Sequence, residues 1–478
     1  MRAEESDQEQ VKIRHEPIEE ISSKELAVFA APEGVNNVSN YMMNSLVNPI
    51  LATTLGIGPS SIGIVLMCRG VWDAFTDPIM GYVSDNTKSR MGRRRPFVIL
   101  GGLLMAIMVS VCWLFPSDAS HSYIIWYFGI ATIGFATAQT IFSVPYGALA
   151  MELSTEYNGR TRVQVARTIA QRITHFITPF LFPFCLLSIF PSALHGVRWL
   201  GLALGIFLLA STLAAGLYTK DRIKVVSERK DSFLKAIWST ARSKHFQRIT
   251  FIYLVLVSVL GAFGVFNYYL GIYYVFRGDV SKGASFMAAV ETLANVLTLL
   301  CIPLINKLCA KYGKHNALRL SLSMMIVGSL LQMVLLNPDY PYLMFVSPFF
   351  YSTGIVATFM VLGSMLADVV DADELENHQR REGLFSATAA FMMKTFVAIA
   401  TGASGFLVEA TGFQIESGAD QADGVFNNML ILFSGKCVLL IVCLWVLRNY
   451  PLTAERVAEI QAELRRRGEF PDPPKTSA

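Results

Sequence analysis

The feature that most constrains this chain is a series of long apolar blocks, such as residues 97–115 and 196–218, that alternate with short polar connections. A helix needs roughly 20 apolar residues to cross the hydrocarbon core of a bilayer. Only 16% of the residues are charged, whereas soluble domains average about 25%. The sequence therefore predicts an all-α integral membrane protein and not a soluble globular one.

The polar connections predict how the spans are oriented. Connections after odd-numbered spans, such as residues 56–59 and 337–341, hold no Lys or Arg, whereas those after even-numbered spans, such as residues 88–95 and 307–314, are basic. Basic loops stay on the cytoplasmic side, so both termini are expected to be cytoplasmic in a multi-pass protein of the cell membrane. Twelve spans are expected at residues 27–55, 60–83, 97–115, 122–152, 161–189, 196–218, 249–276, 283–306, 317–336, 341–370, 385–410 and 425–447.

The two halves of the chain resemble each other. Span 4 ends in Glu152 before Arg160, and span 10 ends in Asp368 before Arg380. Chance similarity between apolar helices is the alternative. A six-plus-six repeat with a charged linker is the layout of major-facilitator transporters, whose substrate site lies between the halves. The expected organisation is a cytoplasmic tail (1–26), a six-helix bundle (27–218), a cytoplasmic loop (219–248), a second six-helix bundle (249–450) and a cytoplasmic tail (451–478).

Span 2 carries Arg69, Asp73, Thr76 and Asp77. Steps of three and four residues place these groups on one helical face. Two carboxylates one turn apart with a hydroxyl between them suit a small hard cation such as sodium. Alternatively, one carboxyl holds a proton, because adjacent like charges raise one pKa, or Asp73 only forms a structural salt bridge with Arg69.

Span 11 carries Lys394 in an otherwise apolar stretch. An ionisable group inside the membrane costs roughly 2.5–3.5 kcal/mol on the insertion scale, so it faces a partner or a cavity. The expected partner is the Asp73/Asp77 pair across the bundle. Such a link couples the two halves, and a bound cation would compete with it; a purely structural ion pair is the alternative.

Other polar residues inside predicted spans are candidate solute contacts. Such residues either line an aqueous path or join helices to one another, and for Asn37 and Glu291 the residues alone do not decide between these roles. The candidates are Asn37 on span 1, Arg167, Gln171 and His175 on span 5, Asn267 on span 7, and Glu291 and Asn295 on span 8.

The loop after span 2 is expected to lie at the membrane surface. Asp85 is expected to cap a neighbouring helix end, while Arg90 and Arg93 bind facing carboxylates or lipid phosphates. We interpret these residues, with Asp368 after span 10, as a conformational latch.

Two motifs carry a family resemblance. Residues 72–81 (Trp-Asp-Ala-Phe-Thr-Asp-Pro-Ile-Met-Gly) and 89–96 resemble the span 2 signature of the glycoside–pentoside–hexuronide:cation symporters, the melibiose-permease family. Residues 367–374 and 381–387 resemble that family's second signature, and the similarity extends over residues 27–450. The resemblance implies that Asp73 and Asp77 bind the cation, that Thr76 and Thr140 assist sodium, and that Lys394 is the lysine near that site.

The solute half of the resemblance is altered. Arg167 lies near an arginine that the family uses for sugar, but Asn37 and Ser143 stand where carboxylates bind galactosides, and Gly147 stands where a tryptophan is expected. Ser143 and Tyr146 are further candidate solute contacts on span 4. A different glycoside, a hexuronide or a more apolar solute is therefore expected.

These observations predict a secondary active transporter that carries a sugar or glycoside together with sodium or a proton by alternating access. The alternatives are a sodium-dependent transporter of a lysolipid or other amphiphile, and a non-transporting sensor. Phosphate-binding loops, His-Glu-x-x-His and nucleophile elbows are absent from the sequence, so no enzyme is expected. The expected partners are the solute, the coupling cation and membrane lipids, with no cofactor and no nucleic acid, and the protein is expected to be a monomer.

Overall fold

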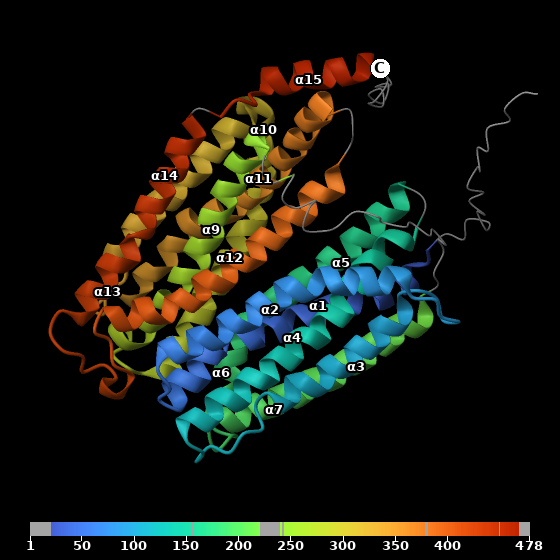
Figure 1. The fold of residues 1–478 in the computed structure, drawn as a ribbon. Coiled ribbons are helices and arrows are strands. Elements are labelled where there is room, and N and C mark those ends of the chain that lie inside the picture. The colour runs from blue at the N-terminus through green and yellow to red at the C-terminus, as the bar shows by residue number, and fades with distance from the viewer. Residues whose placement is uncertain are drawn as a thin grey trace, which may run out of the picture.

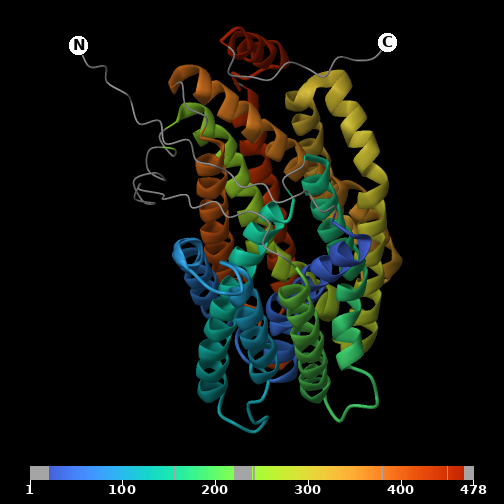
Figure 2. The ribbon, with the colours of Figure 1, turned by 90° about the vertical axis from the view of Figure 1, so that its right-hand side faces the viewer.

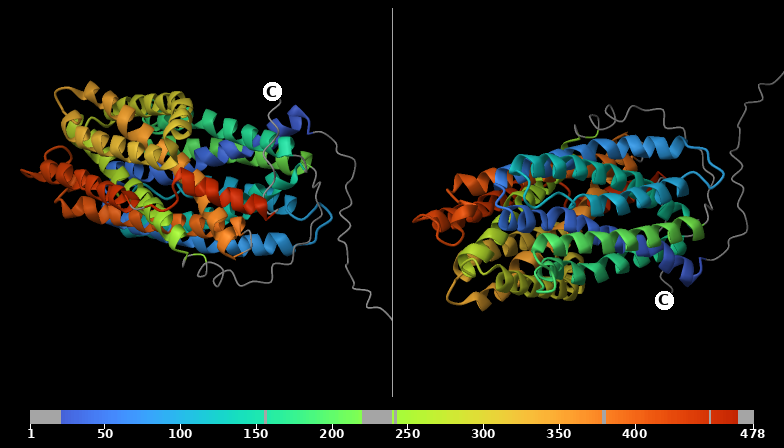
Figure 3. Two further views of the ribbon diagram at one scale, coloured as in Figure 1. Left: turned by 90° about the horizontal axis from the view of Figure 1, so that it is seen from above. Right: turned by 90° about the horizontal axis from the view of Figure 1, so that it is seen from below.

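The fold is that of a helical bundle with its helices along one common axis (Figures 1 and 3). The computed structural model describes residues 21–154, 157–219, 240, 243–377, 381–448 and 450–467. Most of the expected tail 1–26, most of the expected loop 219–248 and the end of the tail 451–478 lie outside these residues. No strand occurs in the described part of the chain.

The N-terminal half consists of six spans, several of which are interrupted. Ser22 accepts a hydrogen bond from the backbone of Glu25 and so caps the first helix, as Ser120 does for the fourth span. The helices are α1 (Ser23–Ser45) with the π-helical segment η1 (Asn48–Thr54), α2 (Pro59–Asn86), α3 (Arg95–Val111), α4 (His121–Glu152), α5 (Tyr157–Ile177) with η2 (Thr178–Phe180) and α6 (Leu181–Cys185), and α7 (Ala193–Tyr218).

The C-terminal half repeats this pattern. Its helices are α9 (Lys244–Tyr269) with the π-helical segment η3 (Leu270–Val275), α10 (Val280–Leu335), η4 (Pro341–Val346) with α11 (Ser347–Asn377), α12 (Glu382–Ala410), and α13 (Val425–Ser434) with α14 (Lys436–Arg448). α10 contains two spans, because Gly313 has a φ of 79° and turns the chain back. The first span of each half therefore ends in a π-helical segment, which fits an internal repeat.

Twelve spans result, as the sequence predicts, and the all-α major-facilitator fold is confirmed. By length and composition alone, seven helices of the described chain qualify as membrane-spanning, and α3 is apolar but shorter. α1, α2 and α5 are not among them. These three helices carry many of the polar candidates, whereas α4 and α12, which carry Thr140 and Lys394, are among the seven.

The two halves meet closely where α2 packs against α12. A Cβ atom on Gly63 would lie 2.5 Å from the carbonyl oxygen of Gly402, and one on Gly405 would lie 2.0 Å from that of Pro59. Only glycine permits this approach. We call this end of the bundle, with Pro59 and Gly405, the far end, and the opposite end, with the loop 88–95, the basic end.

A further helix, α15 (Ala454–Arg466), lies in the segment expected as a tail. It packs across the basic end of the C-terminal half, outside the bundle (Figures 1 and 2). Ile460 and Leu464 are buried there, and Gln461 donates a hydrogen bond of 3.1 Å to Asp371. Part of the expected tail is therefore a docked amphipathic helix.

Candidate functional site

The acidic pair of α2 lies at the interface between the halves. Lys394 on α12 contacts both carboxylates, with its Nζ 2.8 Å from Asp73 Oδ2 and also bonded to Asp77 Oδ2. The side chains of the acids are each 24% exposed and that of Lys394 is 41% exposed. The expected ion pair is therefore present, and its side chains are only partly buried.

Two hydroxyl groups complete this cluster. Thr140 on α4 donates to Asp77 Oδ1 over 3.0 Å, and it also lies 3.2 Å from Asp73 Oδ1. Its oxygen is 3.1 Å from that of Thr76. Carboxylate and hydroxyl oxygens together are the ligands that hard cations prefer. We call Asp73, Asp77, Thr76, Thr140 and Lys394 the acid-pair cluster.

Arg69 does not form the alternative salt bridge with Asp73. The structure describes no ion pair between them; the guanidinium donates instead to Asn44 Oδ1 over 2.8 Å and to the carbonyl of Met43 over 3.2 Å. It also faces the ring of Phe135. The amides of α1 therefore satisfy Arg69, and Lys394 is the cation that balances the pair.

A cation at the acid-pair cluster would have to compete with Lys394, which bonds both carboxylates. The ammonium of Lys394 occupies the space between the two carboxylates, where a cation would bind. Such a cation would weaken the contact between α12 and α2, because it would compete with Lys394 for the carboxylates of Asp73 and Asp77.

Arg167 of α5 binds a carboxylate that sequence reasoning missed. Its Nη2 lies 2.7 Å from Glu33 Oε2 on α1. Its guanidinium also lies 5.0 Å from the ring of Tyr146, which is buried between Phe29 and Phe142. Glu33 could have been found from its place one turn before Asn37 in an apolar span.

The other candidates of the N-terminal half have mixed roles. Asn37 donates to Thr174 over 3.0 Å, so it joins α1 to α5. Tyr146 is 1% exposed and donates a hydrogen bond to the carbonyl of Phe29. Its ring contacts the guanidinium of Arg167, so its role is to position that arginine. Gln171 and Ser143 are half-buried. In this conformation Gln171 and Ser143 are therefore better placed than Asn37 or Tyr146 to meet a solute.

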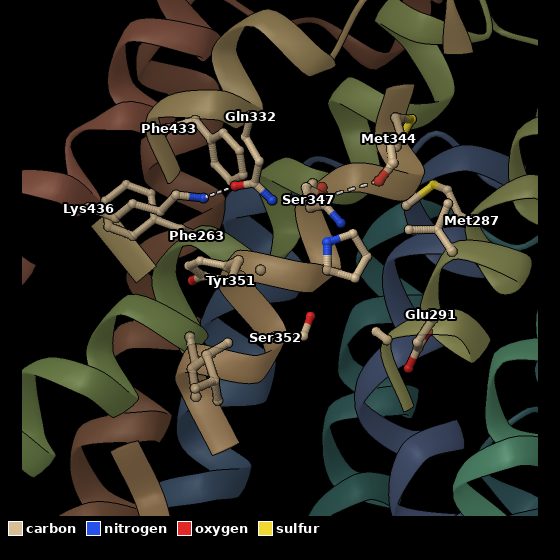
Figure 4. Close-up of a pocket in the computed structure, with 17 residues that line it drawn as sticks. Phe263, Met287, Glu291, Gln332, Met344, Ser347, Tyr351, Ser352, Phe433 and Lys436 are labelled. Carbon is tan, nitrogen blue, oxygen red and sulfur yellow. Dashed lines mark hydrogen bonds between the residues drawn. The ribbon is translucent and has the colours of Figure 1, made fainter. Parts of the chain in front are cut away.

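The C-terminal half contains a partly open cavity of about 250 Å³, lined by α9, α10, η4, α11, α13 and α14 (Figure 4). Asn267 and Glu291 line it, as do Gln332 and Lys436, which sequence reasoning missed. The sequence does contain a signal for Lys436, because it is the lone lysine of the predicted span 425–447. Glu291 accepts a hydrogen bond of 3.1 Å from Tyr41 of α1, so this cavity adjoins the interface between the halves.

Several hydrogen bonds join the halves around the middle and far end of the bundle. Asn295 donates to the backbone carbonyl of His175 over 2.9 Å, so the side chain of Asn295 joins the halves, whereas the imidazole of His175 takes no part in this bond. Tyr268 and Thr53 lie within 2.9 Å of each other, and Glu409 accepts from the backbone of Ser60 over 2.9 Å. The halves are therefore tied together at the far end.

The latch residues form ion pairs within each half. Arg93 lies 2.6 Å from Glu152, and Arg94 bonds Asp85, which therefore binds an arginine and does not cap a helix. Lys314 lies 2.7 Å from Asp368 in the other half. Arg90 is exposed. The two halves thus carry matching carboxylate–base pairs at the basic end, as their repeated sequences suggest.

Comparison with known proteins places these features in a family. The model of a family described as MFS/sugar transport protein matches residues 28–454. The glucuronide carrier protein homolog of Escherichia coli is 24% identical, over 94% of this chain and 97% of its own. Sodium-dependent lysophosphatidylcholine symporter 1-B of Danio rerio is 26% identical, over 84% and 81%.

The fold also matches solved transporters. A bacterial homologue of the human lysosomal transporter Spinster superposes with a TM-score of 0.64 and 14% identity, over 90% of this chain and 97% of that one. At this identity the match concerns the fold. It agrees with the twelve spans and the two halves described above.

Proposed function

We propose, since this chain belongs to the MFS/sugar transport protein family, that it carries a sugar or glycoside together with sodium or a proton. Family membership makes it a multi-pass secondary transporter and not an enzyme, and the resemblance to the melibiose-permease family holds. The nature of the solute and the coupling to a cation are the proposal. The proposal also includes a cell-membrane location, cytoplasmic termini and the two bundles 27–218 and 249–450.

The observation that carries the proposal is the sharing of Lys394 by two carboxylates of the other half. Lys394 bonds Asp73 and Asp77 across the α2–α12 interface. A cation that enters between the carboxylates would compete with the ammonium. Binding a cation would thereby change the strength of the contact between the halves, which is what coupling requires of a transporter with alternating access.

The far-end contacts supply the second element of the mechanism. Ser60 with Glu409 and Thr53 with Tyr268 join the halves there, and these bonds must break when the far end opens. The driving force is adequate, because one charge that crosses 100 mV yields about 2.3 kcal/mol, which corresponds to roughly fifty-fold accumulation.

The relatives supply two solute classes for testing. A glucuronide carrier homolog supports a glycoside, and the lysophosphatidylcholine symporters support an amphiphile as the second candidate.

The test is uptake of labelled glycosides and lysophosphatidylcholine by proteoliposomes with imposed sodium or proton gradients. Asp73→Asn and Asp77→Asn should each abolish accumulation while exchange of solute persists. Asp339→Asn is the matched control, because Asp339 is exposed and pairs with Arg277 at the far end, away from the acid-pair cluster. Accumulation by both site variants would refute the cation site, and failure of the wild type to move any solute would favour a sensor.

A further inference from the structure

Lys436 is the most deeply buried lysine side chain of the described chain. It is 1% exposed and lines the cavity of the C-terminal half. Its ammonium bonds the side-chain oxygen of Gln332. An ammonium has three donors, and among the described residues Gln332 is its sole oxygen acceptor. No carboxylate lies within ion-pair distance of it in this part of the chain.

Aromatic rings provide the rest of its surroundings. The ammonium lies 3.4 Å from the ring centre of Phe433 and 4.6 Å from that of Tyr351. Cation–π contacts offset part of the cost of burying a charge, but each contributes far less than a desolvated ion pair. The charge of Lys436 is therefore only partly compensated, and an anionic group that entered the cavity would be strongly favoured.

The cavity has two chemically different sides. Figure 4 shows Lys436 and Gln332 on one side and Glu291 on the other. Glu291 already accepts a hydrogen bond from Tyr41 of the opposite half, and a carboxylate has further lone pairs for hydroxyl donors. Ser347, Ser352 and Asn267 also line the cavity. A ligand with an anionic end and a hydroxylated end matches this arrangement.

We propose that this cavity is an anion subsite in which Lys436 binds a carboxylate of the transported solute, while hydroxyls of the same solute donate toward Glu291. The inference rests on the proposed transport function for its role, but the binding can be measured without transport. The near-complete burial of Lys436 disfavours a lipid headgroup as the source of the anion. A carboxylate-bearing monosaccharide is the class that suits a cavity of about 250 Å³.

The subsite is separate from the acid-pair cluster. Its residues come from α9, α10, α11 and α14, with η4 and α13, whereas the cluster is built by α2, α4 and α12. The contact between Tyr41 and Glu291 links the cavity to α1 of the other half. The bound anion and the coupling cation would then occupy different places in the same transport cycle.

The test compares glucuronate with glucose, which differ at one carbon, by isothermal titration calorimetry of the purified protein in saturating sodium. The wild type should bind glucuronate about tenfold tighter or better, and Lys436→Met should abolish this preference. Lys436→Arg should restore part of it. Lys282→Met is the matched control, because Lys282 is exposed and pairs with Asp279 outside the cavity, and it should leave the preference unchanged.

Sodium binding, measured in the same preparations, shows that Lys436→Met is folded. A glucuronate preference that survives in that variant overturns the subsite. A wild type that binds neither sugar acid nor glucose, yet accumulates another neutral glycoside or lysophosphatidylcholine, also overturns it and leaves the proposed transport function intact. If glucuronate binding depends on Lys436 but no solute crosses the membrane, the subsite stands and the transport function fails.

Discussion

Two lysines lie within the bundle, and their surroundings are opposite. Lys394 is 41% exposed and contacts two carboxylates from the other half. Lys436 is 1% exposed and contacts one amide and two aromatic rings from its own half. The first charge is more than balanced by the protein, and the second lacks a counter-ion among the described residues.

The two lysines suggest two separate roles, one in coupling to a cation and one in recognition of the solute. A charge balanced within the protein responds to a competing ion, because exchange of partners changes the contact between the halves. A charge that lacks a protein counter-ion responds to a ligand that brings one. We therefore interpret the acid-pair cluster as the cation switch and the C-terminal cavity as the place where the solute supplies the missing charge.

The largest effect is expected from Lys394→Met. The substitution leaves Asp73 and Asp77 as two close carboxylates without a cation, so accumulation of solute should be lost. The protein should be destabilised by about 1–3 kcal/mol, less than for a fully buried pair because these side chains are only partly buried. Solute uptake and the thermal midpoint in low sodium measure this. Added sodium should recover part of the stability, and an unchanged midpoint would mean that the ion pair contributes nothing.

A second substitution tests whether the loss comes from unbalanced charge. Asp77→Asn in the Lys394→Met background removes one of the two stranded carboxylates, so the double variant should be more stable than Lys394→Met alone. Residues in direct contact show coupling energies of about 0.5–3 kcal/mol in double-mutant cycles. Thermal midpoints of all four proteins give this energy, and strictly additive effects would contradict the shared charge.

The sequence predicted the acid-pair cluster better than the cavity, for a physical reason. Asp73, Thr76 and Asp77 lie at helical spacing on one span, and a lone lysine such as Lys394 needs a counter-charge inside a membrane. The same reasoning applied to Lys436 finds no acid, because its partners are an amide and rings whose positions depend on how α10, α11 and α14 pack. Spacing along one helix reveals a cluster on that helix, whereas a cavity between helices appears only in the fold.

The fold was likewise predictable where it depends on composition, and less so where it depends on local geometry. The twelve apolar blocks of the sequence predicted the twelve membrane spans. The break at Gly435 between α13 and α14, the π-helical ends η1 and η3, and the docking of α15 had no counterpart in the prediction. Glu33 was overlooked because one carboxylate near the start of a span resembles a surface residue, yet it binds Arg167 over 2.7 Å.

Lys436→Met is expected to have a smaller effect on stability than Lys394→Met, and one of opposite sign. Replacing a buried charge by an apolar side chain of similar size is often neutral or stabilising, by about 1–4 kcal/mol. Here the cation–π contacts lower the gain, so we expect an unchanged or slightly raised thermal midpoint in the absence of solute. A clear drop would indicate that the rings and Gln332 compensate the charge fully.

The smallest effect is expected from Gln332→Met, which removes the one oxygen that bonds the ammonium of Lys436 and keeps the volume of the side chain. A hydrogen bond to a charged group contributes about 1.5–3 kcal/mol to stability. The rings of Tyr351 and Phe433 remain in contact with the ammonium. The free energy of unfolding should therefore fall by about 1.5 kcal/mol or less. In the Lys436→Met background the same substitution should not destabilise the protein, because the bond is already absent and the buried Gln332 amide has lost that partner. Four thermal midpoints decide this, and an equal loss in both backgrounds would show that Gln332 stabilises the cavity wall by itself and not through the buried charge.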